Sequence, residues 1–195
     1  EYGWFDYDYS SGIYLGPDPG ETYIYCYIGD GVTIANNTAG QGGGLFVDSH
    51  WDDMTPFESN VYLRLSGLVR FENNTAGWIG GGMLLFMHPG DTFSTRTYAT
   101  TVFKNNTAFL GGGLFVDAQH EDDDDDSEFQ VRDIVFESNR AEASGGGTFL
   151  WLYENTHLYS RRALFYNNSA GECGGAARHS IGNTSNGTVL RIAHT

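Results

Sequence analysis

The 195-residue chain has two cysteines, four prolines, a single lysine (Lys104) and no long apolar run. Features that are scarce or absent exclude several classes of protein. The two cysteines, Cys26 and Cys173, are too few for a disulfide-stapled scaffold. No Gly-X-Y period is present, which excludes collagen. No apolar run approaches the roughly 18 residues of a membrane helix, so we expect no membrane insertion. The formal net charge of -15 would repel phosphates, so we expect no nucleic-acid partner.

Glycine and aromatic residues are abundant instead. Glycine contributes 27 residues, about twice its usual share. The hydrophobic fraction of 40% and the aromatic fraction of 15% are enough for a packed core and argue against disorder. Because the chain starts at Glu1 with neither Met nor a signal peptide, we expect a processed mature chain or an excised fragment.

A degenerate repeat covers most of the chain. Each copy has a short apolar run, an Asn-rich turn and then a glycine cluster, and an apolar strand follows each of the first four clusters. The five copies are residues 32–39, 69–76, 101–108, 134–141 and 163–170, and their glycine clusters are residues 42–44, 80–82, 111–113, 145–147 and 174–175.

This repeat predicts an all-β solenoid. Short β-rich runs alternate with Gly or Asn turns, and no helical period of 3.6 residues is present. A unit of about 30 residues cannot bury its own apolar face, but stacked units can, with equivalent residues about 4.8 Å apart. We expect about five to six coils. Residues 1–31 would form an aromatic-rich N-terminal segment and first coil, and residues 32–195 would form the β-helix repeats.

Stacking would align equivalent residues into ladders. One apolar residue per coil would face the interior, forming an aromatic ladder of Ile34, Phe71, Phe103, Phe136 and Phe165. The second residue of each Asn turn would form an amide ladder of Asn37, Asn74, Asn106, Asn139 and Asn168. Asn is expected there because it tolerates left-handed backbone and its amide can bond the copy above. The first Asn of each pair would point outward.

The pattern Phe-x-x-Asn followed by Gly-Gly-aliphatic resembles the repeat of the polymorphic outer membrane proteins. The copies are Phe71-x-x-Asn74 with Gly81-Gly82-Met83, Phe103-x-x-Asn106 with Gly112-Gly113-Leu114, Phe136-x-x-Asn139 with Gly146-Gly147-Thr148, and Phe165-x-x-Asn168 with Gly174-Gly175-Ala176. The resemblance covers roughly residues 32 to 182. It implies a right-handed parallel β-helix, and it implies surface display and adhesion rather than one particular chemistry.

Six N-glycosylation sequons favour an extracellular or cell-surface glycoprotein. Four of the sequons recur at the Asn turn of the repeat, where an attached sugar would project outside the stack of coils. The fourth coil breaks this series with Ser138-Asn139-Arg140. The alternative is that the turn needs Asn-Asn-Thr and carries no sugar. The predicted glycosylation sites are Asn36, Asn73, Asn105, Asn167, Asn183 and Asn186.

We expect no enzymatic activity. Pectin-type hydrolases on β-helices need paired Asp residues on one strand face, a nearby His and a basic residue. Asp48 and Asp117 hold equivalent places two coils apart, but Phe86 holds that place in the coil between them. The Asn-Thr-Asp, Gly-His-Gly and Arg-Ile-Lys motifs of such hydrolases are absent, as is a strand-borne Asp cluster of the lyase type. We therefore assign no catalytic residue.

Two features leave metal binding open, although we expect neither a metal site nor a cofactor. A histidine ends the strand after the glycines in three coils and precedes acidic residues: His50, His88 and His120. Stacking would align these side chains in one column. They would either bind a divalent metal or lie in solvated loops without an ion. The run Asp122–Asp126 would either recruit Ca²⁺ or form a mobile charged loop, and it lacks EF-hand spacing.

The strand after the glycines also predicts an outward apolar stripe. If Leu45, Val47 and their equivalents face inward, alternation places their neighbours outside. Monomers rarely expose so large an apolar surface. Three explanations remain open for this stripe. A protein partner or a second copy of the chain would cover it, or its aromatic rings would form a platform for carbohydrate. Otherwise the inward and outward assignment of the strand residues is reversed, or a terminal segment covers the stripe. The stripe consists of Phe46, Leu84, Phe86, Phe115, Phe149, Trp151 and Tyr153.

These features predict a structural extracellular glycoprotein. The sequence offers no helical cap for the open sheet edges of a solenoid, and such edges pair with other chains. We expect self-association into a homopolymer, a filament, sheath or appendage, by end-to-end and lateral packing. The alternative is an adhesin-like β-helix module of a larger surface protein, and a polysaccharide lyase or hydrolase comes third.

Head-to-tail stacking has a consequence for the cysteines. Cys26 lies in the first coil and Cys173 in the last recognisable one, too far apart for an internal disulfide in a straight solenoid. Stacking would bring Cys173 of one subunit towards Cys26 of the next and allow an intersubunit disulfide. Otherwise both residues remain unpaired.

Overall fold

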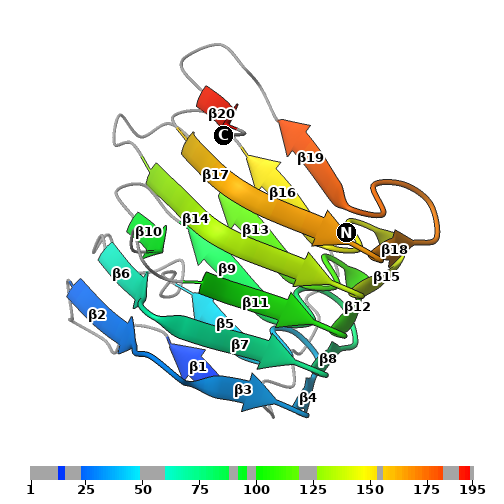
Figure 1. Ribbon diagram of the computed structural model, residues 1–195, viewed down its shortest axis with the longest axis horizontal. Helices are drawn as coiled ribbons and strands as arrows, with labels where there is room; N and C mark the ends of the chain where they lie inside the picture. Colours follow the sequence, from blue (N-terminus) through cyan, green and yellow to red (C-terminus); the bar gives the residue numbers. More distant parts are fainter. Residues whose placement is uncertain are drawn as a thin grey trace, which may run out of the picture.

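The computed structural model describes residues 13–15, 23–48, 60–87, 92–95, 100–118, 127–152, 156–181 and 189–193. Within these ranges the chain is an all-β solenoid of parallel strands without a helix. Equivalent strands of successive coils lie side by side, from β2 and β3 at one end to β19 and β20 at the other (Figure 1). No helix in the described ranges is long and apolar enough to cross a membrane.

Three parallel sheets form the walls of the solenoid. Sheet A contains β1 (Ile13–Leu15), β5 (Leu45–Asp48), β9 (Met83–Met87), β13 (Leu114–Ala118), β16 (Thr148–Leu152) and β19 (Ala177–Ile181). Sheet B contains β2 (Tyr23–Ile28), β3 (Thr33–Ala35), β6 (Asn60–Leu65), β7 (Leu68–Glu72), β10 (Thr92–Thr95), β11 (Thr100–Lys104), β14 (Ser127–Glu137), β17 (Thr156–Tyr166) and β20 (Val189–Ala193). Sheet C contains β4 (Thr38–Ala39), β8 (Thr75–Ala76), β12 (Thr107–Leu110), β15 (Arg140–Ser144) and β18 (Ser169–Ala170).

The solenoid makes about four turns, fewer than the five to six coils expected from the sequence. Each turn runs through sheets B, C and A in that order, and the five strands of sheet C are separated by four coil-to-coil steps. Within the described residues, the strands at the two ends of the stack do not complete further coils. β1 pairs only with β5 in sheet A, and β20 pairs only with the first half of β17 in sheet B.

The main core confirms the aromatic ladder. Phe71, Phe103 and Phe136 are at most 2% exposed, and they lie in register on neighbouring strands of sheet B. The rings of successive phenylalanines stack at centroid distances of 4.9, 5.1 and 4.7 Å, ending at Phe165. The inward residues of the strand after the glycines, from Leu45 to Leu152, complete this core as expected. Burial of one large ring per coil therefore stabilises the stack.

The amide ladder is also confirmed. The Asn106 side chain is fully buried and donates from Nδ2 to the Phe71 carbonyl (2.8 Å) and to Asn139 Oδ1 (3.0 Å). Its Oδ1 accepts from the backbone N–H and the Nδ2 of Asn74, at 3.0 and 3.1 Å. The same pattern recurs from Asn37 to Asn168. Each buried amide is thus satisfied by the coils on either side.

The left-handed backbone lies one residue before the place expected. The positive φ angles belong to the first residue of each turn: Asn36 (60°), Asn73 (55°), Asn105 (53°), Ser138 (55°) and Asn167 (56°). Asn tolerates this region better than most residues. The two residues of the turn therefore have different roles. The first adopts the positive φ angle, and the side chain of the second forms the hydrogen bonds of the amide ladder.

The glycine cluster is required by both conformation and space. Gly111 has a φ of 63°, which L side chains rarely adopt. A Cβ on Gly113 would lie 2.5 Å from the carbonyl oxygen of Gly147 and 3.0 Å from the Phe136 ring. Only glycine allows adjacent coils to approach this closely beside the aromatic ladder.

Candidate functional site

An exposed column of asparagines runs along the turn between sheets B and C. Asn36, Asn73, Asn105 and Asn167, called here the sequon column, are all exposed to solvent. Asn105 Nδ2 donates to Asn73 Oδ1 at 3.3 Å, so side chains of neighbouring coils are within reach of each other. Because the second Asn of each turn is bound in the amide ladder, the first is the one presented outside.

The hydroxyl of each of these sequons begins a strand of sheet C. Thr38, Thr75 and Ser169 are exposed and Thr107 is half-buried, whereas Arg140 occupies this place in the fourth coil. Both elements of four sequons are therefore on the surface. The other two predicted sites, Asn183 and Asn186, lie outside the described residues.

The predicted apolar stripe is largely wrong as an exposed surface. Phe46, Leu84, Phe115 and Phe149 do point away from the main core, but they are at most 9% exposed. They form a second, smaller core with Ile79, against which Phe86 and Leu110 pack. Of the other stripe residues, Trp151 is 37% exposed and Tyr153 lies outside the described residues. Four of the seven are thus unavailable to a partner.

The glycine turns of the same chain cover these side chains. A Cβ on Gly111 would lie 2.9 Å from the Cβ of Phe115, and one on Gly145 would lie 2.7 Å from that of Phe149. Each turn therefore folds back over the outer face of sheet A. The alternation of residues along a strand predicts which face of the sheet a side chain is on. It does not predict which other segment of the chain packs against that face. The apolar residues directly before the glycines, Ile79 and Leu110, are the sequence signal that could have revealed this cover.

The outermost column of sheet A combines acidic and aromatic residues. Asp48, Phe86, Asp117 and Trp151 lie opposite one another in successive coils, so Phe86 separates the two aspartates, as the sequence predicts. Among the residues that the structure describes, no group of three or more His, Cys, Asp or Glu side chains is arranged to hold a metal ion. His50, His88, His120 and the acidic run at 122–126 lie outside the described residues.

Two stacked aromatic pairs on the surface were not predicted. The rings of Trp78 and Phe109 are nearly parallel at 4.7 Å, and Trp78 is 50% exposed. Tyr25 and Tyr62 stack at 4.8 Å on sheet B, with Tyr25 76% exposed. Neither pair follows the repeat motif, so their alignment depends on loop lengths that the pattern does not specify.

A charged row crosses the outer face of sheet B. Lys104 Nζ lies 2.8 Å from Glu137 Oε1. The hydrogen bond to Lys104 holds the pKa of the Glu137 carboxyl below its usual range, and the same bond raises the pKa of Lys104. The hydrogen bond from Tyr166 to Glu137 raises the pKa of the Tyr166 hydroxyl. The only lysine of the chain is therefore used to align neighbouring coils.

The two cysteines are free and lie in different columns. Cys26 packs against the main core opposite Leu63, and burial raises the pKa of its thiol, which disfavours the reactive thiolate. Cys173 belongs to the column of the glycine turns, 3.0 Å from Ser144 Oγ. A stack that keeps the columns aligned would not bring Cys173 of one subunit to Cys26 of the next, so the geometry favours the alternative in which both cysteines remain unpaired.

The last coil leaves its share of the core partly uncovered. Phe165, Ala163, Ala177 and His179 are half-buried, although their counterparts in the preceding coil, Ile134, Phe136, Thr148 and Leu150, are buried. Among the described residues, no strand pairs with the outer edges of β18 and β19. This end of the stack therefore presents both apolar side chains and sheet edges.

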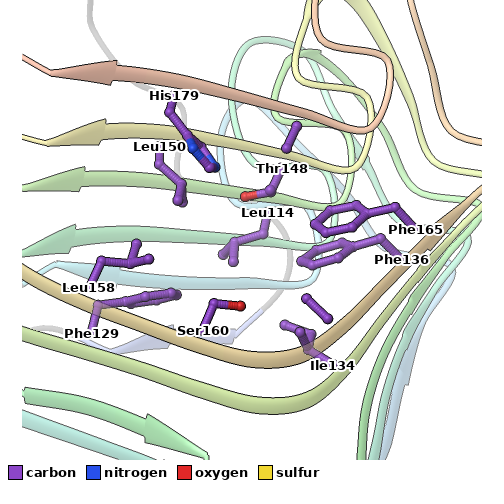
Figure 2. A pocket seen from close by; sticks show the side chains of 12 residues that line it. Leu114, Phe129, Ile134, Phe136, Thr148, Leu150, Leu158, Ser160, Phe165 and His179 are labelled. Carbon is purple, nitrogen blue, oxygen red and sulfur yellow. The ribbon is translucent and has the colours of Figure 1, made fainter. Parts of the chain in front are cut away.

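A cavity of about 210 Å³ lies beneath this end (Figure 2). Its walls are mainly apolar, with Leu114, Phe136 and Leu158 among them, and its polar residues are Thr148, Ser160 and His179. Burial lowers the pKa of His179, which favours its neutral form.

The cavity forms because inward residues become smaller towards the end of the chain. In sheet A, Leu114 is followed in the next two coils by Thr148 and Ala177. In sheet B, Ile134 is followed by Ala163 in the next coil. Aligning the repeats column by column would have revealed this trend, but the repeat motif alone does not contain these positions.

Comparison with protein-family models, with curated proteins and with solved structures finds no match.

Proposed function

We propose that this protein is a structural extracellular glycoprotein that polymerises end to end through its solenoid. The observation that supports it most strongly is the last coil, where half-buried core residues adjoin the sheet edges of β18 and β19. Unpaired edges next to exposed apolar surface favour addition of another β-coil. A heterologous contact of this kind does not close, and it therefore produces a filament.

The incomplete coils at the two ends support this proposal because they are complementary. β1 adds a strand to sheet A alone, and β20 adds a strand to the first half of sheet B alone. In a head-to-tail stack, β19 would meet β1 of the next copy and β20 would meet its β2. The added strands then occupy different walls of one shared coil and do not collide.

The finer features of the proposal come from the sequence. A right-handed solenoid agrees with the resemblance to polymorphic outer membrane proteins and with the handedness of nearly all parallel crossovers. The sequon column suits a cell-surface or secreted location, with N-glycans projecting from one edge. Phe46, Leu84, Phe115 and Phe149 do not mediate lateral packing between subunits, because the chain itself buries them.

A charge placed inside the exposed end tests the proposal. Ala170 on β18 continues an inward alanine column and is half-buried. In a single chain, the ammonium of Ala170→Lys can reach solvent through the open end, but stacking would bury it. The matched control is Leu164→Lys, which adds the same charge on the exposed outer face of the same coil.

Light scattering of the full 195-residue chain at increasing concentration provides the measurement. The wild-type chain and the Leu164→Lys variant should assemble, and Ala170→Lys should remain monomeric. A wild-type chain that stays monomeric at high concentration, or equal assembly of all three proteins, would overturn the proposal.

A second candidate function is that of an adhesin-like module, which the Trp78–Phe109 pair favours. The two rings are stacked and Trp78 is 50% exposed, so this pair offers exposed aromatic surface that could pack against a sugar. A module of this kind would bind immobilised oligosaccharides as a single chain, and Trp78→Ala would abolish the binding. Tyr27→Ala, which removes an exposed ring elsewhere, is the control. Equal binding by wild type and Trp78→Ala would reject this candidate.

A further inference from the structure

We propose that the cavity beneath the last coil binds a small, uncharged, largely apolar molecule that carries one hydrogen-bonding group, of the size of a monocyclic phenol. This site goes beyond the proposed polymerisation and does not depend on it. The cavity is lined by strands of a single chain, with β13, β16 and β19 on one side and β14 and β17 on the other.

One buried polar group at this site has no partner. Thr148 is only 4% exposed, and its Oγ1 has no hydrogen-bond partner within the described part of the chain. A buried hydroxyl without a partner is unfavourable. A ligand hydroxyl in the cavity would satisfy it, whereas Leu114 and Met83, which precede Thr148 in the same column, have no hydrogen-bonding side chain of this kind.

Two further polar side chains line the same space. Thr148 and His179 lie on the neighbouring strands β16 and β19, where Thr148 is opposite Ala177 and His179 is two residues further along. Ser160 approaches from sheet B on the other wall. Figure 2 shows the Thr148 hydroxyl and the His179 ring among the aliphatic and aromatic side chains that line the cavity. A threonine, a serine and a neutral imidazole can each donate or accept, which matches a hydroxyl better than a charged group.

The size of the cavity limits the ligand. An apolar protein cavity of about 150 Å³ holds benzene. The volume here is about 210 Å³, which leaves room for one ring with a short substituent. Phe136, Phe165 and Leu158 supply apolar walls that would pack against such a ring. A charged ligand is disfavoured because no group of opposite charge lines the cavity, and burial favours the neutral form of His179.

Phenol and toluene are suitable probes because they differ only by a hydroxyl in place of a methyl group. We expect the wild-type chain to bind both saturably, and phenol to perturb the NMR signals of Thr148 and His179. Thr148→Val should weaken phenol binding by several-fold to about tenfold, since one hydrogen bond is lost, and should leave toluene binding unchanged. Thr101→Val is the matched control, because Thr101 also has a buried hydroxyl without a partner in the described residues but does not line the cavity.

A second variant fills the space. Ala177→Leu restores a large side chain in the column of Leu114 and should abolish binding of both probes. If that variant does not fold, the comparison of Thr148→Val with Thr101→Val decides the question alone. Absence of saturable binding by the wild-type chain would overturn the proposal, as would equal phenol affinity for wild type and Thr148→Val. Repeating the titration on the Ala170→Lys chain separates this result from assembly.

Discussion

Replacing Asn106 by leucine should be among the most destabilising single changes outside the aromatic ladder. The Asn106 amide makes four side-chain hydrogen bonds, and leucine of similar size makes none. The backbone N–H of Asn74 then loses the acceptor that Asn106 Oδ1 provides, and the Phe71 carbonyl loses the donor. At about 1–3 kcal/mol for each unpaired buried group, the free energy of unfolding should fall by about 2–6 kcal/mol.

The position in the ladder provides an internal test. Asn37 is the first rung and is only half-buried, and its Nδ2 donates to Asn74 Oδ1. After Asn37→Leu, the backbone N–H of residue 37 still donates to that oxygen. We therefore expect a clearly smaller loss for Asn37→Leu than for Asn106→Leu.

Urea unfolding followed by circular dichroism, on chains made without glycosylation, measures these losses. Asn105→Gly is the matched control, because it removes the adjacent exposed amide and glycine adopts the same positive φ. The control should stay within about 0.5 kcal/mol of wild type. Equal stability of Asn106→Leu and Asn105→Gly would refute the assignment of Asn106 to a buried, fully bonded rung.

Three further predictions follow from the same geometry. Phe103→Ala removes a ring stacked between two others, and denaturant unfolding should show a loss of about 3–5 kcal/mol; an unchanged unfolding midpoint would place the ring outside the core. Mass spectrometry of native protein should find sugar on the four asparagines of the sequon column and none on buried Asn139, and four unmodified sites would contradict this. Because the folded-state pKa of Glu137 is lowered, its carboxylate stabilises the fold at neutral pH, and this contribution is lost as the pH falls from the ordinary carboxyl range near 4.3 through the lowered pKa of the folded state. The stability difference between wild type and Glu137→Gln should therefore shrink in acid, and a constant difference would exclude the charge effect.

The features that the sequence predicts well are those repeated in every coil. Phe71, Phe103 and Phe136 recur with the same neighbours, so one interior assignment applies to all of them, and the amide ladder follows from the same spacing. The exposure of the sequon column follows as well, because the second Asn of each turn must face inward.

The features that could not be predicted depend on contacts outside the repeat. Phe115 and Phe149 were assigned to the correct side of their strands, but the glycine turn that covers them is a tertiary contact without a strand period. The cavity depends on the coincidence of Thr148 on β16 with Ser160 and Ala163 on β17, all of them at variable positions of the repeat. The sequence overestimates the coil number because, among the described residues, β1 and β20 each add a strand to one sheet alone.

Fibre diffraction of concentrated, oriented protein tests the end-to-end solenoid most directly. Filaments built by stacking these parallel coils should give a strong reflection along the filament axis at about 4.8 Å, the spacing between neighbouring strands. Its persistence in Leu164→Lys and its loss in Ala170→Lys would agree with growth through the exposed end. Discrete particles without an axial reflection, or filaments whose strand spacing lies across the axis, would contradict the account.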